Sequence, residues 1–105
     1  MQGYQLTFYT QQDRTHKRLP LAQWIVEEAR RLGIGGATMT SAAEGFGRDK
    51  KVRSAAFFEL SNQPLQVTMA VSESDAERIF DKLKEEEIDV FYVKIPVEYG
   101  MTGQR

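Results

Sequence analysis

The strongest constraint on the fold is a pattern that occurs twice, in which an alternating strand comes before a helix with one apolar face. Residues 4–10 and 65–71 alternate between the two faces of a strand. Apolar residues then recur at helical spacing in 20–32 and again after residue 72. Periods of two and of 3.6 residues predict strands and helices. Extended segments after the two helices complete two strand–helix–strand units.

Two such units in tandem give the split β-α-β plan of ferredoxin-like folds. We therefore expect an α+β fold, a sandwich in which an antiparallel sheet carries two helices on one face. The 105 residues contain no linker or low-complexity tract, so we expect a single domain spanning 1–105. The last strand, 91–97, is partly apolar on both faces. This predicts that other subunits cover the second face of the sheet.

Several residues mark the expected ends of these elements. Pro20 suits the first turn of the first helix, and Gly33 its C-terminal cap. Ser72 suits the N-terminal cap of the second helix. The acidic run 85–87 should end that helix as a solvated, frayed turn, because acidic side chains oppose the dipole there. Pro96 is expected to close the last strand.

Charge and composition restrict the function classes. Lys plus Arg total 14 and Asp plus Glu total 15, a balance that argues against nucleic-acid binding. The chain has no cysteine, which excludes disulfides and thiolate chemistry. It has no run of about 20 apolar residues that could span a membrane. Its first residues lack the pattern of a signal peptide, so we expect a cytoplasmic protein.

The chain offers little for catalysis or metal binding. Its single histidine, His16, lies in a polar segment and is expected to be an exposed loop residue. The run 33–36 follows a helix and precedes a strand, which is the wrong order for a dinucleotide loop and predicts a helix stop and turn. Trp24 is expected in the core or an interface. We expect no enzyme activity, no metal site and no cofactor.

The most informative segment is 44–53, where two glycines are followed by four cations (Arg48, Lys50, Lys51 and Arg53). Free backbone amides together with Arg and Lys are the groups that bind phosphate. The same residues would equally suit a solvated basic hairpin loop, and the residues alone leave both interpretations open. A short strand is expected at 54–60.

A family resemblance rests on motifs spread over nearly the whole chain. The sequence resembles the nitrogen-regulatory PII-like superfamily, and most closely its small branch known as a domain of unknown function. The motifs are Gly36-Ala37-Thr38, Gly45-Phe46-Gly47, Leu60-Ser61, Pro64, Pro96-Val97-Glu98 and Thr102-Gly103.

The resemblance implies a homotrimer that binds a small ligand, such as AMP, ADP or ATP, in clefts between subunits. It also implies control of a partner protein, a transporter or an enzyme. Gly36 and Thr38 would lie near the base of the ligand. The root of the partner loop would be Gly45, Phe46, Gly47 and Arg48, and the loop itself would contain Asp49, Lys50, Lys51 and Arg53.

Three departures from the PII pattern modify these expectations. Asp49 replaces a glutamine, residues 85–89 replace a loop of glycine and lysine that holds phosphates, and paired arginines are missing from the tail. The acidic replacement implies that ATP binds more weakly than AMP or ADP. The partner loop has no tyrosine, which excludes uridylylation of the PII type.

Two other functions remain open from the residues. The first is a small α+β-barrel enzyme acting on a metabolite, with a tyrosine or His16 as the acid–base group. The second is an RNA-binding module, in which Tyr4, Phe8 and Tyr92 would stack on bases. A dimer would favour the enzyme, a monomer the RNA module and a trimer the PII-like protein.

Overall fold

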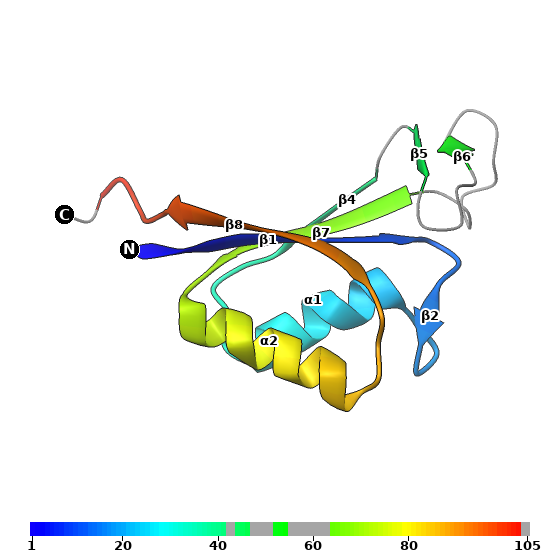
Figure 1. The fold of residues 1–105 in the computed structure, drawn as a ribbon, viewed down its shortest axis with the longest axis horizontal. Helices are drawn as coiled ribbons and strands as arrows, with labels where there is room; N and C mark the ends of the chain where they lie inside the picture. Colours follow the sequence, from blue (N-terminus) through cyan, green and yellow to red (C-terminus); the bar gives the residue numbers. More distant parts are fainter. Residues whose placement is uncertain (42–43, 47–51, 55–63, 104–105) are drawn as a thin grey trace.

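The computed structural model describes residues 1–41, 44–46, 52–54 and 64–103, without the side chains of 44–46 and 52–54. Ten elements follow one another along this part of the chain (Figure 1). In order they are β1 (Gln2–Gln11), β2 (Thr15–His16), β3 (Leu19–Pro20), α1 (Leu21–Arg31), β4 (Thr38–Ser41), β5 (Glu44–Phe46), β6 (Val52–Ser54), β7 (Pro64–Val71), α2 (Glu73–Glu85) and β8 (Phe91–Glu98).

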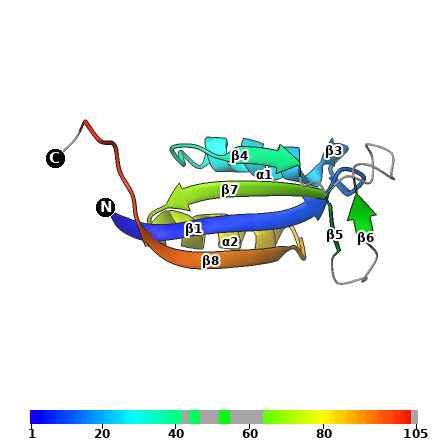
Figure 2. The same cartoon turned by 90° about the horizontal axis from the view of Figure 1, so that it is seen from above.

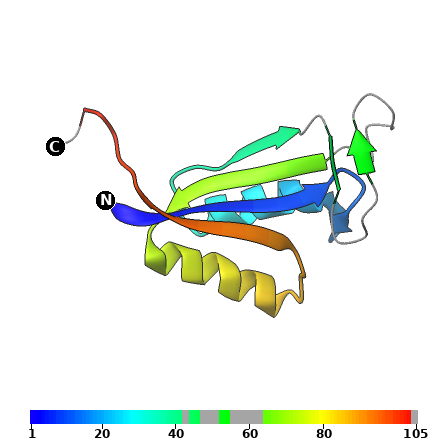
Figure 3. The ribbon, with the colours of Figure 1, turned by 45° about the horizontal axis from the view of Figure 1, so that its top comes forward.

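The main sheet has the strand order β4-β7-β1-β8, and each neighbouring pair is antiparallel. Both helices pack on the same face of this sheet (Figures 1 and 3). The fold is α+β and ferredoxin-like, with two helices on one face, as the two sequence units predicted. Two short hairpins, β2–β3 and β5–β6, lie near one end of the sheet (Figure 2).

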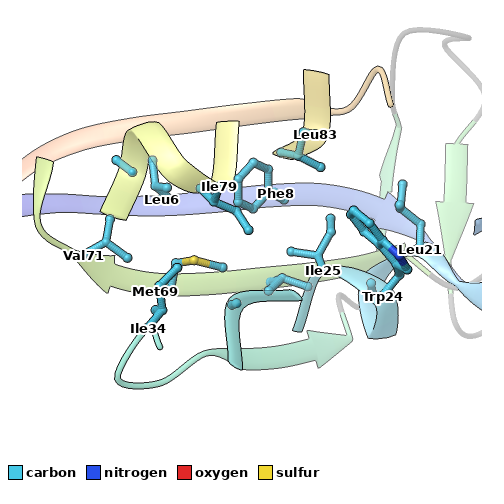
Figure 4. Close-up of a cluster of buried hydrophobic side chains, with 14 of the residues drawn as sticks. Leu6, Phe8, Leu21, Trp24, Ile25, Ile34, Met69, Val71, Ile79 and Leu83 are labelled. Carbon is cyan, nitrogen blue, oxygen red and sulfur yellow. The ribbon is translucent and has the colours of Figure 1, made fainter. Parts of the chain in front are cut away.

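The core forms where alternate strand residues meet the apolar helix faces (Figure 4). Leu6 and Phe8 of β1 and Val67 of β7 are fully buried beneath the helices. Ile25 and Ile79 cover them from α1 and α2 and are equally buried. Each such side chain contributes about 1.5–3 kcal/mol through its removal from water. Alternation in the strands thus selects the face on which the helices pack.

The two helices end in the same backbone motif but with different residues. Beyond α1, Gly33 has a φ of 82°, and the amide of Ile34 donates to the carbonyl of Ala29 at 3.0 Å. Beyond α2, Glu87 has a φ of 56°, and the amide of Ile88 donates to the carbonyl of Leu83 at 2.9 Å. This is the Schellman arrangement, in which a left-handed residue closes the helix. The last turn of α2 is therefore closed by backbone hydrogen bonds, where the acidic run predicted a frayed end.

Other element boundaries differ from the sequence expectations in small ways. Pro96 lies within β8, opposite Tyr4, and does not end the strand. A proline is tolerated there because β8 is an edge strand of the sheet. Of the short strand expected at 54–60, the structure describes only Ser54, the last residue of β6, and residues 55–60 lie outside the described part of the chain. Neither described helix is both long and apolar enough to cross a membrane.

Candidate functional site

The sheet face opposite the helices carries exposed apolar side chains along its edge strand. Phe91 and Ile95 of β8 are 57% and 47% exposed. The register pairs Phe91 with Tyr9, whose ring centroid lies 5.7 Å from that of Phe91. Of the elements described, no helix covers this face, which we call the open face. Exposed side chains of this size on one face of a sheet are typical of an association surface.

Threonines occupy the centre of the open face. Thr7 is only 6% exposed, and its hydroxyl lies 3.2 Å from that of Thr68 on β7. Thr38, on β4, pairs with Thr68 and is exposed. The predicted ligand residue Thr38 thus lies on the open face, at the sheet edge opposite β8.

The structure separates the two halves of the predicted ligand set within one chain. Gly36 is exposed just before β4, whereas Gly45 and Phe46 belong to β5, which follows β4 (Figure 2). In β5, Gly45 pairs with Arg53 and Phe46 with Val52 of β6. Arg53 therefore belongs to a strand and not to a loop. Gly47, Arg48, Asp49, Lys50 and Lys51 lie outside the described residues.

A cluster around Glu86 is the site that sequence reasoning missed. Oε1 of Glu86 lies 2.9 Å from Nε2 of His16 and 2.9 Å from Nζ of Lys17, and its Oε2 lies 3.6 Å from Nζ of Lys82. The Glu86 side chain is 12% exposed, so the prediction of a solvated acidic end is wrong for this residue. Hydrogen bonds from His16 and then Lys17 lower the pKa of the Glu86 carboxyl from 4.5 to about 2.

His16 is not the exposed loop residue that its polar neighbours suggested. It lies in β2, its side chain is 21% exposed, and its ring packs edge-on against that of Trp24, with centroids 4.8 Å apart. Trp24 belongs to α1 and is 4% exposed, which confirms its predicted place in the core. A carboxylate beside an imidazole can orient a general base. Here the imidazole is held between that carboxylate and an indole. This arrangement joins β2 to α1 and to the end of α2.

The hairpin that presents His16 has an unfavourable turn. Its two turn residues, Lys17 and Arg18, have φ values of 52° and 70°. Two-residue hairpins favour this mirror-image turn, but usually with asparagine or glycine. For other residues the left-handed region costs roughly 1–2 kcal/mol each. Contacts elsewhere must offset this strain, and the ion pair of Lys17 with Glu86 is one of them.

A cavity of about 270 Å³ lies between α2 and β8, next to the Glu86 turn. Most of its wall is apolar, and one lysine and one aspartate also line it. The lining residues are Phe80, Leu83, Lys84, Ile88, Asp89, Val90 and Tyr92. Among the described residues, no group of three histidine, aspartate or glutamate side chains could hold a metal ion.

Comparison with known proteins agrees with the observed fold. The fold is that of PII-like proteins. A candidate PII-like signalling protein of Thermus thermophilus aligns with a TM-score of 0.64 and 26% identity, over 91% of this chain and 89% of that one. CPII of Thiomonas intermedia K12, a nitrogen-regulatory PII-like protein solved with ADP, AMP and bicarbonate, also aligns with a TM-score of 0.64. Its identity is 18%, over 92% of this chain and 89% of that one.

The chain belongs to the DUF190 family, described as Uncharacterized ACR, whose model matches residues 3–95. A UPF0166 protein of Aquifex aeolicus (strain VF5) is 29% identical over 80 residues, which are 75% of this chain and 76% of that protein. These matches confirm the resemblance that the glycine motifs indicated, including its assignment to the uncharacterised PII-like branch.

Proposed function

We propose that this protein is a cytoplasmic, single-domain regulator of the PII-like kind that has no catalytic activity. In this proposal it forms a homotrimer, binds an adenine nucleotide between subunits, and controls a partner protein through the loop after Gly47. The observation that carries the proposal is the exposed apolar β8 edge of the open face, on a fold shared with CPII, which was solved in complex with ADP and AMP.

The open face supports self-association because its apolar side chains lie together at an edge strand. Phe91 and Ile95 would lose most of their exposed apolar area if a second copy covered them. Burial of such area contributes about 25 cal/mol per Å².

The charges near the α2–β8 turn support a ligand with few phosphates. Glu86 is paired with cations of its own chain, so its charge is largely balanced. Glu85 and Glu87 remain exposed, the side chain of Glu85 to 70%. Two exposed carboxylates would repel a triphosphate more than a monophosphate. AMP and ADP are therefore the proposed ligands, with ATP binding more weakly.

The ligand part of the proposal is tested by titration calorimetry with AMP, ADP and ATP on the purified protein. Saturable binding of AMP or ADP, with one site for each chain, is the expected result. Absence of heat with all three nucleotides at millimolar concentration would contradict an adenine-nucleotide site. Release of phosphate or of any other product during the titration would contradict the absence of catalysis.

A further inference from the structure

Three residues other than glycine have positive φ in the part of the chain that the structure describes, and they lie in two neighbouring turns. Lys17 and Arg18 form the turn of the β2–β3 hairpin, and Glu87 lies in the turn between α2 and β8. Backbone strain of this kind persists only where surrounding contacts impose it, and it often marks segments with two states.

Glu86 joins these two turns. Its carboxylate binds Nε2 of His16 and Nζ of Lys17 on the hairpin, each at 2.9 Å, while its backbone amide donates to the carbonyl of Lys82 at 3.0 Å and so caps α2. Figure 1 shows β2 beside the connection from α2 to β8. A guanidinium N–H of Arg14, before the hairpin, also donates to the backbone carbonyl of Asp89.

The hairpin also borders the only tryptophan of the chain, Trp24. The His16 ring packs edge-on against the Trp24 indole, which lies among the core side chains (Figure 4). The base of the hairpin is closed by the amide of Leu21, which donates to the carbonyl of Arg14 at 2.7 Å. Movement of the hairpin would therefore change both the water exposure of Trp24 and the protection of the Leu21 amide.

We infer that the β2–β3 hairpin is a strained latch that Glu86 holds closed against the α2–β8 turn. In the closed state the contacts of Glu86 with His16 and Lys17 keep the hairpin turn in the left-handed region. In the open state those contacts are broken, the turn relaxes, and His16 leaves Trp24. The latch acts on the cavity beside it, because Ile88, Asp89 and Val90 of the same turn form part of its wall. This inference is independent of the proposed nucleotide site.

The first test uses the fluorescence of Trp24 and its quenching by acrylamide. Glu86→Gln removes the charge at nearly constant volume and should shift the emission to the red and increase quenching. Glu85→Gln is the matched control, because Glu85 is the preceding residue, its side chain is 70% exposed, and its contact to Lys82 is 3.8 Å. The control should behave as the wild type. Equal protection of Trp24 in the wild type and in Glu86→Gln would overturn the latch.

The second test asks whether strain is the opening force. Arg18→Gly relaxes one left-handed position without touching a contact of Glu86. On its own, Arg18→Gly should slow hydrogen exchange of the Leu21 amide. This measurement does not need Glu86→Gln and so can be made even if that variant does not fold. Combined with Glu86→Gln, it should reduce acrylamide quenching towards the wild-type value. Faster or unchanged exchange in Arg18→Gly would contradict a strained latch, and so would the absence of any rescue.

Discussion

The ring of Tyr9 on β1 packs against the ring of Phe91 on β8, with 5.7 Å between centroids and 54° between planes. The pair lies on the open face, where Phe91 remains 57% exposed. Aromatic contacts of this geometry add about 0.5–1.5 kcal/mol beyond area burial. The contact orders two large apolar side chains at the sheet edge before any partner arrives, which favours a defined interface.

Gly3→Ala should destabilise the protein because the space beside Gly3 is already filled. A Cβ there would lie 2.1 Å from the carbonyl oxygen of Val71 and 2.7 Å from Cε1 of Tyr99. Overpacking of this kind costs about 1–3 kcal/mol. Urea unfolding at a fixed protein concentration measures the change. Gly35→Ala is the control, since a Cβ at Gly35 meets nothing within 4 Å, and equal losses in the two variants would contradict the account.

Glu87→Gly should raise the free energy of unfolding by about 0.5–1 kcal/mol, because glycine adopts the left-handed conformation without a Cβ clash. The residue lies just beyond the cap of α2, with a φ of 56°. Glu85→Gly, two residues earlier and within the helix, should instead lower stability. Opposite signs in urea unfolding are the expected result. Destabilisation by both substitutions would show that Glu87 is not strained.

The Glu86 contacts should make stability depend on pH in the acid range. The carboxyl pKa is about 2 in the folded protein and 4.5 where the carboxyl has no partners. A depressed folded pKa contributes stability that is fully present above 4.5 and is lost as the pH falls towards 2. The free energies of unfolding of the wild type and of Glu86→Gln, compared between pH 2 and pH 4.5, measure this contribution. The two curves should converge with acid, and a constant difference would contradict the assignment.

Nucleotide affinity should depend on Arg48, the cation that follows the Gly45-Phe46-Gly47 motif. A charge-assisted hydrogen bond contributes roughly 1.5–3 kcal/mol. Arg48→Ala should therefore weaken AMP or ADP binding about tenfold to a hundredfold in calorimetry. Glu85→Lys should narrow the gap between ATP and AMP, because it reverses one exposed charge. Tight ATP binding that Arg48→Ala leaves unchanged would show that the phosphate lies elsewhere.

The fold could be predicted because its determinants are local in sequence. Alternation in 4–10 and 65–71 identified the two central strands. Gly33 marked the end of the first helix, and Ser72 marked the start of the second. Pro96 misled because a proline ends a strand only where its missing N–H is needed. The sequence does not show that β8 is an edge strand, where a proline is accepted.

The Glu86 cluster could not be predicted, because the contact between His16 and Glu86 joins residues 70 positions apart. Glu86 also lies between two other glutamates, and composition does not distinguish a partly buried glutamate from its exposed neighbours. One signal was present: Lys82 precedes Glu86 by four residues and so shares its helix face. Nothing in the sequence indicated that Lys17 and Arg18 occupy a left-handed turn.

The open face predicts that a charge at its apolar edge disrupts assembly. Ile95→Glu should convert the protein to a monomer, because a buried, unpaired carboxylate is strongly unfavourable. Met39→Glu is the control: Met39 is 49% exposed on β4 but pairs with the buried Val67, on the helix side of the sheet. It should assemble as the wild type does. Dissociation of both variants would show that the open face is not the interface.

The mass of the wild-type protein in solution, measured by light scattering during size-exclusion chromatography at micromolar concentration, decides whether the chain forms the proposed homotrimer. A homotrimer predicts three times the 12.0 kDa mass of the chain. A stable species of 12.0 kDa, with Ile95 and Phe91 left open to water, would contradict the account.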